Sequence, residues 1–301
     1  MNAIDESPTE ILWLHIPKTS STFSITVQVL CQEKKFWEKI LPPRTTSSTT
    51  GYNQTNLNKF TRIYRGCVYL KQFTDWNPNI RGVNTDSINE CNWTCKNLFW
   101  HRPIPSNWDP ATFVTILRNP KSRLISSFLD GHFHELSKES KTQLNMTMNG
   151  KVINRLVHEA GNRLLNDHDY ALELFNIYSK LPENIGCQVK MIAGEHCQHN
   201  VIPTEETFNQ AKQRLHQLKY VGIYERYQES IEYFHKLILP NSKRGLHPLE
   251  LHRFRDSSIF PNRVKLRKTL EALDYHDPLD DRIYEEAIIR FNHHINSLKK
   301  L

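Results

Sequence analysis

The sequence predicts an α/β fold in which a central, mainly parallel sheet carries helices on both faces. Two observations lead to this prediction. Short apolar runs typical of buried strands recur along the chain, and each is followed by a loop and then by apolar residues at helical spacing. The 301 residues show no Pro/Gly/Ser-rich linker between two patterned halves. We therefore expect one domain, residues 1–301.

The first strand and helix are predicted near the N-terminus. Residues 11–16 form a short apolar run that is typical of a buried strand. Phe23, Val27 and Leu30 then recur at helical spacing, which predicts a helix beginning around residues 19–21. The unit is strand, tight loop and helix.

The same unit is predicted again after a long, weakly patterned stretch. Residues 36–108 show no sustained periodicity, which favours long loops with short elements. Residues 112–117 then form a strand rich in β-branched residues, ended by Arg-Asn-Pro at 118–120. The apolar residues of 124–128 predict the helix that follows.

The remaining chain is predicted to be mostly helical. Residues 131–185 have a helical pattern, and a further apolar stripe covers 208–218. Residues 220–223 predict a third strand, which leads into a helix through 231–238. An amphipathic helix is expected over 283–295.

Charge and hydropathy indicate the kind of partner. The formal net charge is +7 and the isoelectric point is near 9.0, which favours anionic partners such as phosphates, sulfates or acidic polymers. No run of 18 or more apolar residues predicts a membrane span, and the first ten residues are too polar for a signal peptide. Glycosylation sequons at Asn53, Asn92 and Asn145 are as many as chance would give. The Golgi lumen, if an anchor has been trimmed, and the cytoplasm both stay open.

The six cysteines permit disulfides but are too sparse for a disulfide scaffold. Cys91 and Cys95 with His101 lack the spacing of a zinc finger, and no second Cys pair follows nearby. We expect no metal site.

The loop after the first strand has the composition of an anion site. Lys18 precedes Thr19, Ser20, Ser21 and Thr22 at the predicted helix start. Backbone N–H groups, hydroxyls and an ammonium therefore converge there. A capped helix beside an exposed Lys is the alternative. The triphosphate-binding pattern G-x-x-x-x-G-K-[ST] is absent from this loop.

A second candidate anion site follows the strand at 112–117. Arg118 stands at the strand end, where a guanidinium can hold a phosphate through two hydrogen bonds. Ser126 lies two helical turns into the next helix, where its hydroxyl could add a donor. In parallel sheets, ligands bind beyond the carboxyl ends of the strands, so both loops stand where chemistry is expected.

Four segments together resemble the carbohydrate sulfotransferases that use 3'-phosphoadenosine-5'-phosphosulfate (PAPS). The segment His-Ile-Pro-Lys at 15–18 is similar to heparan sulfate 2-O- and 6-O-sulfotransferases, whereas residues 18–22 and 116–128 are closer to galactose 3-O-sulfotransferases. Residues 220–230 and 281–287 resemble two further shared blocks. The segments span almost the whole chain in order and spacing. The resemblance implies the P-loop-like sulfotransferase fold.

The resemblance also implies donor contacts. Lys18 and the segment Thr19, Ser20, Ser21, Thr22 and Phe23 would bind the 5'-phosphosulfate of PAPS, and Arg118 and Ser126 would hold the 3'-phosphate. The product would be 3'-phosphoadenosine-5'-phosphate (PAP), and no metal would be needed. Ser20-Ser21 replaces the Gly-Gly of the heparan enzymes. Because Ser adopts positive φ poorly, this difference leaves the acceptor open.

The resemblance places a catalytic base at a strand end near residue 101. His101 is our candidate, since imidazole suits proton abstraction from a hydroxyl. The protein has 15 His residues, and His15, His132 and His134 are rivals.

Two further features follow from the family pattern. Arg253 and Arg255 resemble a basic loop that closes over the donor, although a solvated or glycan-binding loop is an equal alternative. Cys187 and Cys197 lie where related enzymes often carry a disulfide, and free buried thiols are the alternative.

Three functions remain open from the sequence. The first is transfer of sulfate to a glycan, and the second is transfer to a small hydroxylated or amino metabolite. The third is a non-catalytic anion- or nucleotide-binding protein on the same fold. A long basic groove would favour the first, and a closed apolar pocket the second. We expect no nucleic-acid partner, and the oligomeric state stays open.

Overall fold

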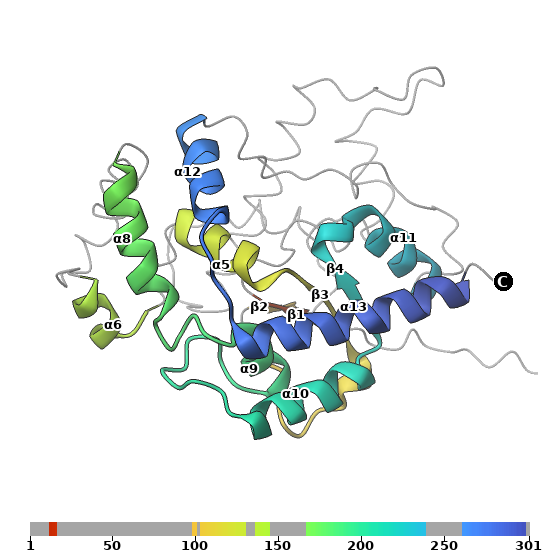
Figure 1. The fold of residues 1–301 in the computed structure, drawn as a ribbon. Coiled ribbons are helices and arrows are strands. Elements are labelled where there is room, and N and C mark those ends of the chain that lie inside the picture. The colour runs from red at the N-terminus through yellow and green to blue at the C-terminus, as the bar shows by residue number, and fades with distance from the viewer. Residues whose placement is uncertain are drawn as a thin grey trace, which may run out of the picture. The chain divides into compact units, whose positions relative to one another are not determined.

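The computed structural model describes residues 12–16, 98–100, 103–130, 136–144, 167–238 and 261–298 (Figure 1). The chain divides into two compact units, and every described residue belongs to the unit formed by residues 1–21, 97–247 and 255–301. One domain over residues 1–301 stays a prediction.

The described residues contain a four-stranded parallel sheet in the order β2-β1-β3-β4. The strands are β1 (Leu12–His15), β2 (Leu98–Trp100), β3 (Phe113–Leu117) and β4 (Tyr220–Ile223). All three pairings are parallel, so the four strands end at one edge of the sheet. The predicted α/β class with a parallel sheet is confirmed.

Strands β3 and β4 are buried along their whole length. Their near-continuous apolar sequence is typical of inner parallel strands that are covered on both sides. The polar side chain inside β3 is satisfied, because Thr115 Oγ1 donates to the main-chain oxygen of Leu14 at 2.9 Å. The register Leu117↔Ile223 sets the ends of β3 and β4 side by side.

The helices follow the predicted periodicity in most places. Alpha helices and 3-10 turns have these bounds: η1 (Pro110–Thr112), α5 (Pro120–Leu129), α6 (Lys138–Gln143), α8 (His168–Ser179), α9 (Cys187–Ala193), α10 (Glu205–Gln217), η3 (Tyr224–Arg226), α11 (Tyr227–Ile238), α12 (Pro261–Glu271) and α13 (Pro278–Leu298). Helices α5, α10, α11 and α13 cover the segments in which helices were predicted. In the described part of 131–185, helices α6 and α8 agree with the predicted helical pattern.

Helices α9 and α12 were not predicted. Every residue of α9 is buried, including the polar Gln188 and Lys190, so no exposed polar face alternates with an apolar one at helical period. In α12, by contrast, most residues are polar or charged, and Leu266 and Leu270 are buried within this strongly charged sequence. An apolar stripe of two residues is too narrow to identify a helix.

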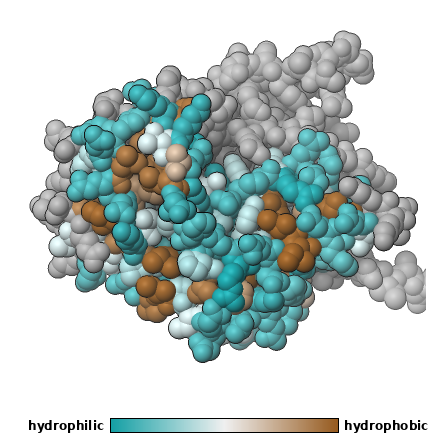
Figure 2. Space-filling model, viewed as in Figure 1, coloured by the Kyte–Doolittle hydropathy of each residue, from teal (hydrophilic) through white to brown (hydrophobic). Residues whose placement is uncertain are grey.

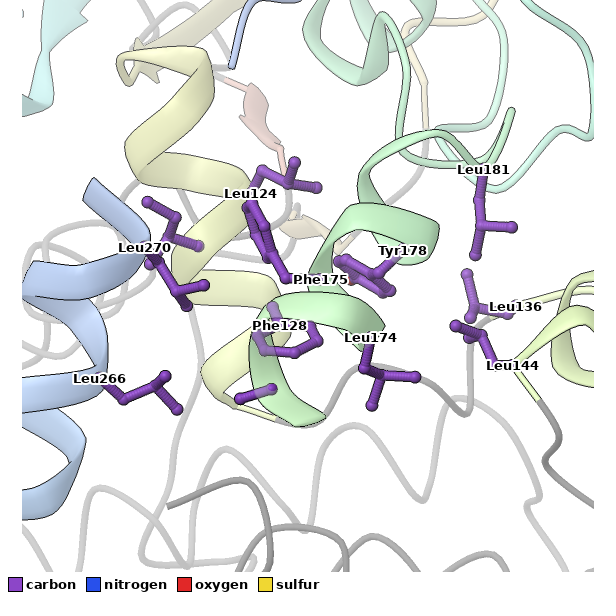
Figure 3. Packing of buried hydrophobic residues seen from close by; sticks show 12 residues of the cluster. Leu124, Phe128, Leu136, Leu144, Leu174, Phe175, Tyr178, Leu181, Leu266 and Leu270 are labelled. Carbon is purple, nitrogen blue, oxygen red and sulfur yellow. The ribbon is translucent and has the colours of Figure 1, made fainter. Parts of the chain in front are cut away.

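A cluster of buried apolar side chains joins α5, α8 and α12 (Figure 3). Phe128 of α5 packs edge-on against Phe175 of α8, with ring centroids 5.2 Å apart. Leu266 and Leu270 of α12 belong to the same cluster. Burying each such side chain contributes about 1.5–3 kcal/mol. The cluster fixes the apolar side of α5, the helix that carries Ser126.

A second apolar region joins the sheet to α11 and α13. Tyr220 of β4 packs against Tyr233 and Phe234 of α11, with ring centroids 5.1 Å apart in both pairs. The ring centroids of Phe291 in α13 and Tyr233 are 5.9 Å apart. The hydroxyl of buried Tyr220 donates to the main-chain oxygen of Ser230 at 2.6 Å. These contacts hold α13 against the strand that ends beside β3.

The face of the molecule in Figure 2 is mainly hydrophilic, and its apolar side chains form separate patches. Large exposed apolar residues come from different parts of the described chain, including Trp108, Val201 and Ile289. Scattered apolar residues of this kind are normal on protein surfaces. Within the described ranges, no helix has both the length and the apolar composition that crossing a bilayer requires.

Candidate anion site at the end of strand β3

The junction between β3 and α5 is built by three residues, Arg118, Asn119 and Pro120. Asn119 is the N-cap of α5, and its side-chain oxygen accepts a hydrogen bond from the main-chain N–H of Ser122 at 3.0 Å. Pro120 occupies the first helical position, where a missing N–H costs nothing. The sequence Arg-Asn-Pro therefore ends the strand and starts the helix within three residues.

Arg118 is a largely buried cation at the carboxyl end of β3, with 8% of its surface exposed. Its guanidinium carbon lies 4.4 Å from the centre of the Tyr224 ring, which follows β4. Burial lowers the pKa of Arg118, whereas Tyr224 and Glu225 raise it. An arginine side chain keeps its charge under these conditions. Stacking on a ring uses the face of a guanidinium, whereas a phosphate is bound along its N–H edge, so the two contacts are compatible.

The main-chain N–H groups of Arg118 and Asn119 are each held by a side chain from another segment. Arg118 N donates to Gln188 Oε1 at 3.1 Å, and Asn119 N donates to Glu225 Oε1 at 3.2 Å. The second carboxylate oxygen of Glu225 accepts a hydrogen bond from the hydroxyl of Tyr284 at 2.7 Å. Burial, together with the hydrogen bond to Glu225, raises the pKa of Tyr284, so its hydroxyl keeps the proton that it donates.

Ser126 lies in α5, eight residues after Arg118, and is half-buried. Ser122 and Ser126 are four residues apart, so they share the less buried side of the helix. Leu124 and Phe128 point the opposite way into the apolar cluster. Arg118 and Ser126 thus belong to one strand-turn-helix unit, as the sequence predicted.

Behind this unit lies a buried group of charged side chains. Asp280 Oδ2 and Oδ1 accept hydrogen bonds from the main-chain N–H groups of Gln188 and Val189, at 3.1 and 2.9 Å. Arg123 Nε lies 3.9 Å from Asp280 Oδ2. Burial, with a further contribution from the carboxylate of Asp277, raises the pKa of Asp280 to about 7.

Most of the predicted site residues lie outside the described residues. This holds for the following: Lys18, Thr19, Ser20, Ser21, Thr22, Phe23, His101, Arg253 and Arg255. The rival bases His132 and His134 and the cysteines Cys91 and Cys95 also lie outside. Of the predicted donor contacts, Arg118 and Ser126 are the two that the structure describes.

Sequence reasoning missed four residues around Arg118, namely Gln188, Tyr224, Glu225 and Tyr284. A signal existed for Tyr224 and Glu225, because they follow a predicted strand that would end beside the strand of Arg118. Gln188 and Tyr284 carried no comparable signal, since neither follows a strand and their contacts depend on how α9 and α13 pack.

The predicted disulfide between Cys187 and Cys197 is confirmed. It ties the start of α9 to the loop that follows this helix. Next to it, buried Lys190 donates to the main-chain oxygens of Pro182 and His199 at 2.6 and 3.0 Å. Within the described part of the chain, no group of three or more His, Cys, Asp or Glu side chains is arranged to hold a metal ion.

Comparison of the chain with known family models, curated proteins and solved structures finds no match.

Proposed function

We propose that the protein transfers the sulfuryl group of PAPS to a hydroxyl of a carbohydrate acceptor, on a P-loop-like α/β fold. The observation that carries the proposal is the junction at Arg118. A buried cation stands at the carboxyl end of a parallel strand, at the start of a helix that presents Ser126 on its less buried side. This edge is where ligands bind in parallel sheets.

The order of the strands supports a donor with two phosphate groups. Strand β1 is the direct neighbour of β3, and the two are parallel. The chain segments that follow them therefore start from the same edge of the sheet. One of these segments contains Lys18 with its hydroxyl-rich sequence, and the other contains Arg118. Anion sites in both segments would suit a nucleotide that carries a 3'-phosphate and a 5'-phosphosulfate.

In the proposed reaction, the acceptor oxygen forms a bond to sulfur while the bond from sulfur to the 5'-phosphate oxygen breaks. Lys18 and the N–H groups of residues 19–23 would stabilise the charge that builds on the leaving phosphate. His101 would take the proton of the acceptor hydroxyl. Arg118 and Ser126 would hold the 3'-phosphate, and Arg253 and Arg255 would contact the donor. PAP leaves as the product.

The test is transfer of labelled sulfate from PAPS to a panel of desulfated glycans. We expect product with at least one glycan, and no product with Lys18→Ala. His101→Ala should slow transfer while leaving PAP affinity unchanged. Lys236→Ala removes an exposed lysine of α11 and serves as the matched control. Absence of any transfer, or full activity of Lys18→Ala, would contradict the proposal.

A further inference from the structure

The first two turns of α13 carry two side chains that each contact a residue holding the Arg118 junction. Asp280 and Tyr284 are four residues apart, so they lie on the same face of the helix. Both are buried, with exposed fractions of 0% and 9%. Helix α13 belongs to the far C-terminal part of the chain, whereas Arg118 and Asn119 follow β3 (Figure 1).

Asp280 acts on Arg118 through Gln188. The carboxylate of Asp280 accepts the N–H of Gln188 and so fixes the start of α9. The Gln188 side chain in turn accepts the N–H of Arg118 through Oε1. Gln188 is fully buried, so this acceptor cannot be replaced by water.

Tyr284 acts on Asn119 through Glu225. Its hydroxyl donates to one oxygen of Glu225, while the other oxygen accepts the N–H of Asn119. Tyr224, the residue before Glu225, has its ring against the guanidinium of Arg118. One hydrogen bond from α13 thus orients a carboxylate next to the candidate anion site.

We propose that α13 is a positioning element for the anion site, in which Asp280 and Tyr284 fix the orientation of Arg118 toward the 3'-phosphate of the donor. This inference rests on the proposed function. Two successive main-chain N–H groups are held by the side chains of Gln188 and Glu225. Helix α13 holds Gln188 through its main-chain N–H and Glu225 through its carboxylate. With both peptide groups fixed, the direction in which the Arg118 side chain leaves the main chain is fixed as well. Such preorganisation raises affinity because less order is lost when the ligand binds.

Tyr284→Phe is the sharpest variant because it removes a single hydroxyl. Glu225 then keeps the N–H of Asn119 but loses the donor that holds its second oxygen. The carboxylate is exposed, and it can turn toward the nearby guanidinium of Arg118. An ion pair formed there would compete with a phosphate for the same cation.

The experiment compares binding of PAP with binding of adenosine 5'-monophosphate, which lacks the 3'-phosphate. Calorimetry on the full chain should show that Tyr284→Phe lowers the affinity for PAP by about tenfold and leaves the affinity for adenosine 5'-monophosphate unchanged. A merely structural defect would weaken both nucleotides alike. Glu286→Gln is the matched control, because Glu286 lies on the same helix and pairs with Lys212 instead.

The outcomes separate this inference from the proposed function. Wild-type protein that binds both nucleotides equally overturns the proposed function and the inference with it. Wild-type protein that prefers PAP, with the same preference in Tyr284→Phe, overturns the inference alone. Gln188→Met, which removes the acceptor of the Arg118 N–H, tests the other connection and should also reduce the preference for PAP. Retained preference in Gln188→Met contradicts the role of Asp280.

Discussion

Arg118 and Lys190 are both buried cations, but their surroundings differ. The ammonium of Lys190, which is completely buried, donates to the main-chain oxygens of Pro182, His199 and Cys197, at 2.6, 3.0 and 3.5 Å. An ammonium has three N–H donors, so these contacts use them all. Arg118 instead stands at the carboxyl end of a strand with its guanidinium against an aromatic ring.

The partners of each side chain indicate whether a buried cation stabilises the fold or is a candidate for ligand binding. Burial lowers the pKa of Lys190 to about 8, while Asp280 and Glu183 raise it, so the side chain is largely protonated at neutral pH. Its charge organises the loop around the Cys187–Cys197 disulfide. At Arg118, the contacts fix the main-chain N–H groups of the junction and stack the guanidinium on the Tyr224 ring, and we propose that this cation binds the 3'-phosphate of the donor. Substitutions at both cations and at their neighbours test this contrast.

Lys190→Met should give the largest effect, on stability. Removing the ammonium deprives three main-chain oxygens of their donor, one of them buried and two partly buried, and we expect a loss of about 3 kcal/mol in the free energy of unfolding. Urea denaturation measures this loss. Lys180→Met, which replaces an exposed lysine, is the control and should stay within about 0.5 kcal/mol of wild type. If Lys190→Met has the unfolding free energy of wild type, Lys190 does not stabilise the fold and does not differ from Arg118 in the proposed way.

Arg118→Ala should mainly affect ligand binding. Because the charge-assisted hydrogen bonds to the 3'-phosphate are lost, the affinity for PAP should fall by about 100-fold. Arg282→Ala is the matched control, because Arg282 also stacks on a ring, that of Phe208, but pairs with Glu205. Equal PAP affinity in wild type and Arg118→Ala, measured by calorimetry, would contradict the assignment.

Ser126→Ala sharpens the same assignment at a smaller scale. One neutral hydroxyl donor to a phosphate is worth about 1 kcal/mol, so PAP affinity should fall about fivefold. Ser122→Ala changes the other serine on the same side of α5 and should have a weaker effect. A larger loss of PAP affinity in Ser122→Ala than in Ser126→Ala would indicate that the phosphate binds nearer the start of α5.

The pH dependence of stability tests the buried carboxyl group of Asp280 behind the junction. The pKa of Asp280 is raised from 3.8 to about 7, chiefly by burial, so the folded protein binds a proton that the unfolded chain has already released. Stability from this group is present below pH 4 and is lost as pH rises toward 7. Asp280→Asn should flatten the fall of the unfolding free energy between pH 4 and 7, as measured by denaturation at several pH values. An unchanged slope would show that Asp280 does not titrate in this range.

Much of the fold could be predicted because its elements have regular periodicity. Strands β3 and β4 and helices α10 and α13 follow apolar patterns that a sequence displays directly. Helix α9 could not be predicted, because all of its residues are buried, including Lys190. Lysine is rarely buried, so nothing in the sequence indicates that this one is enclosed by carbonyl groups.

The candidate site likewise contains some residues that could be predicted from the sequence and others that could not. Arg118 and Ser126 could be predicted because they lie in one local segment, strand, turn and helix, whose spacing is visible in the sequence. Of the supporting residues, Glu225 follows β4 in η3, whereas Gln188 and Tyr284 are brought to the junction by the tertiary packing of α9 and α13. Hydrogen bonds over such sequence separations leave no local pattern.

The most direct test of the account is a crystal structure of the protein with PAP. We predict that the 3'-phosphate lies within hydrogen-bond distance of the Arg118 guanidinium and the Ser126 hydroxyl, at the carboxyl edge of the sheet. A 3'-phosphate bound away from both side chains would contradict the account.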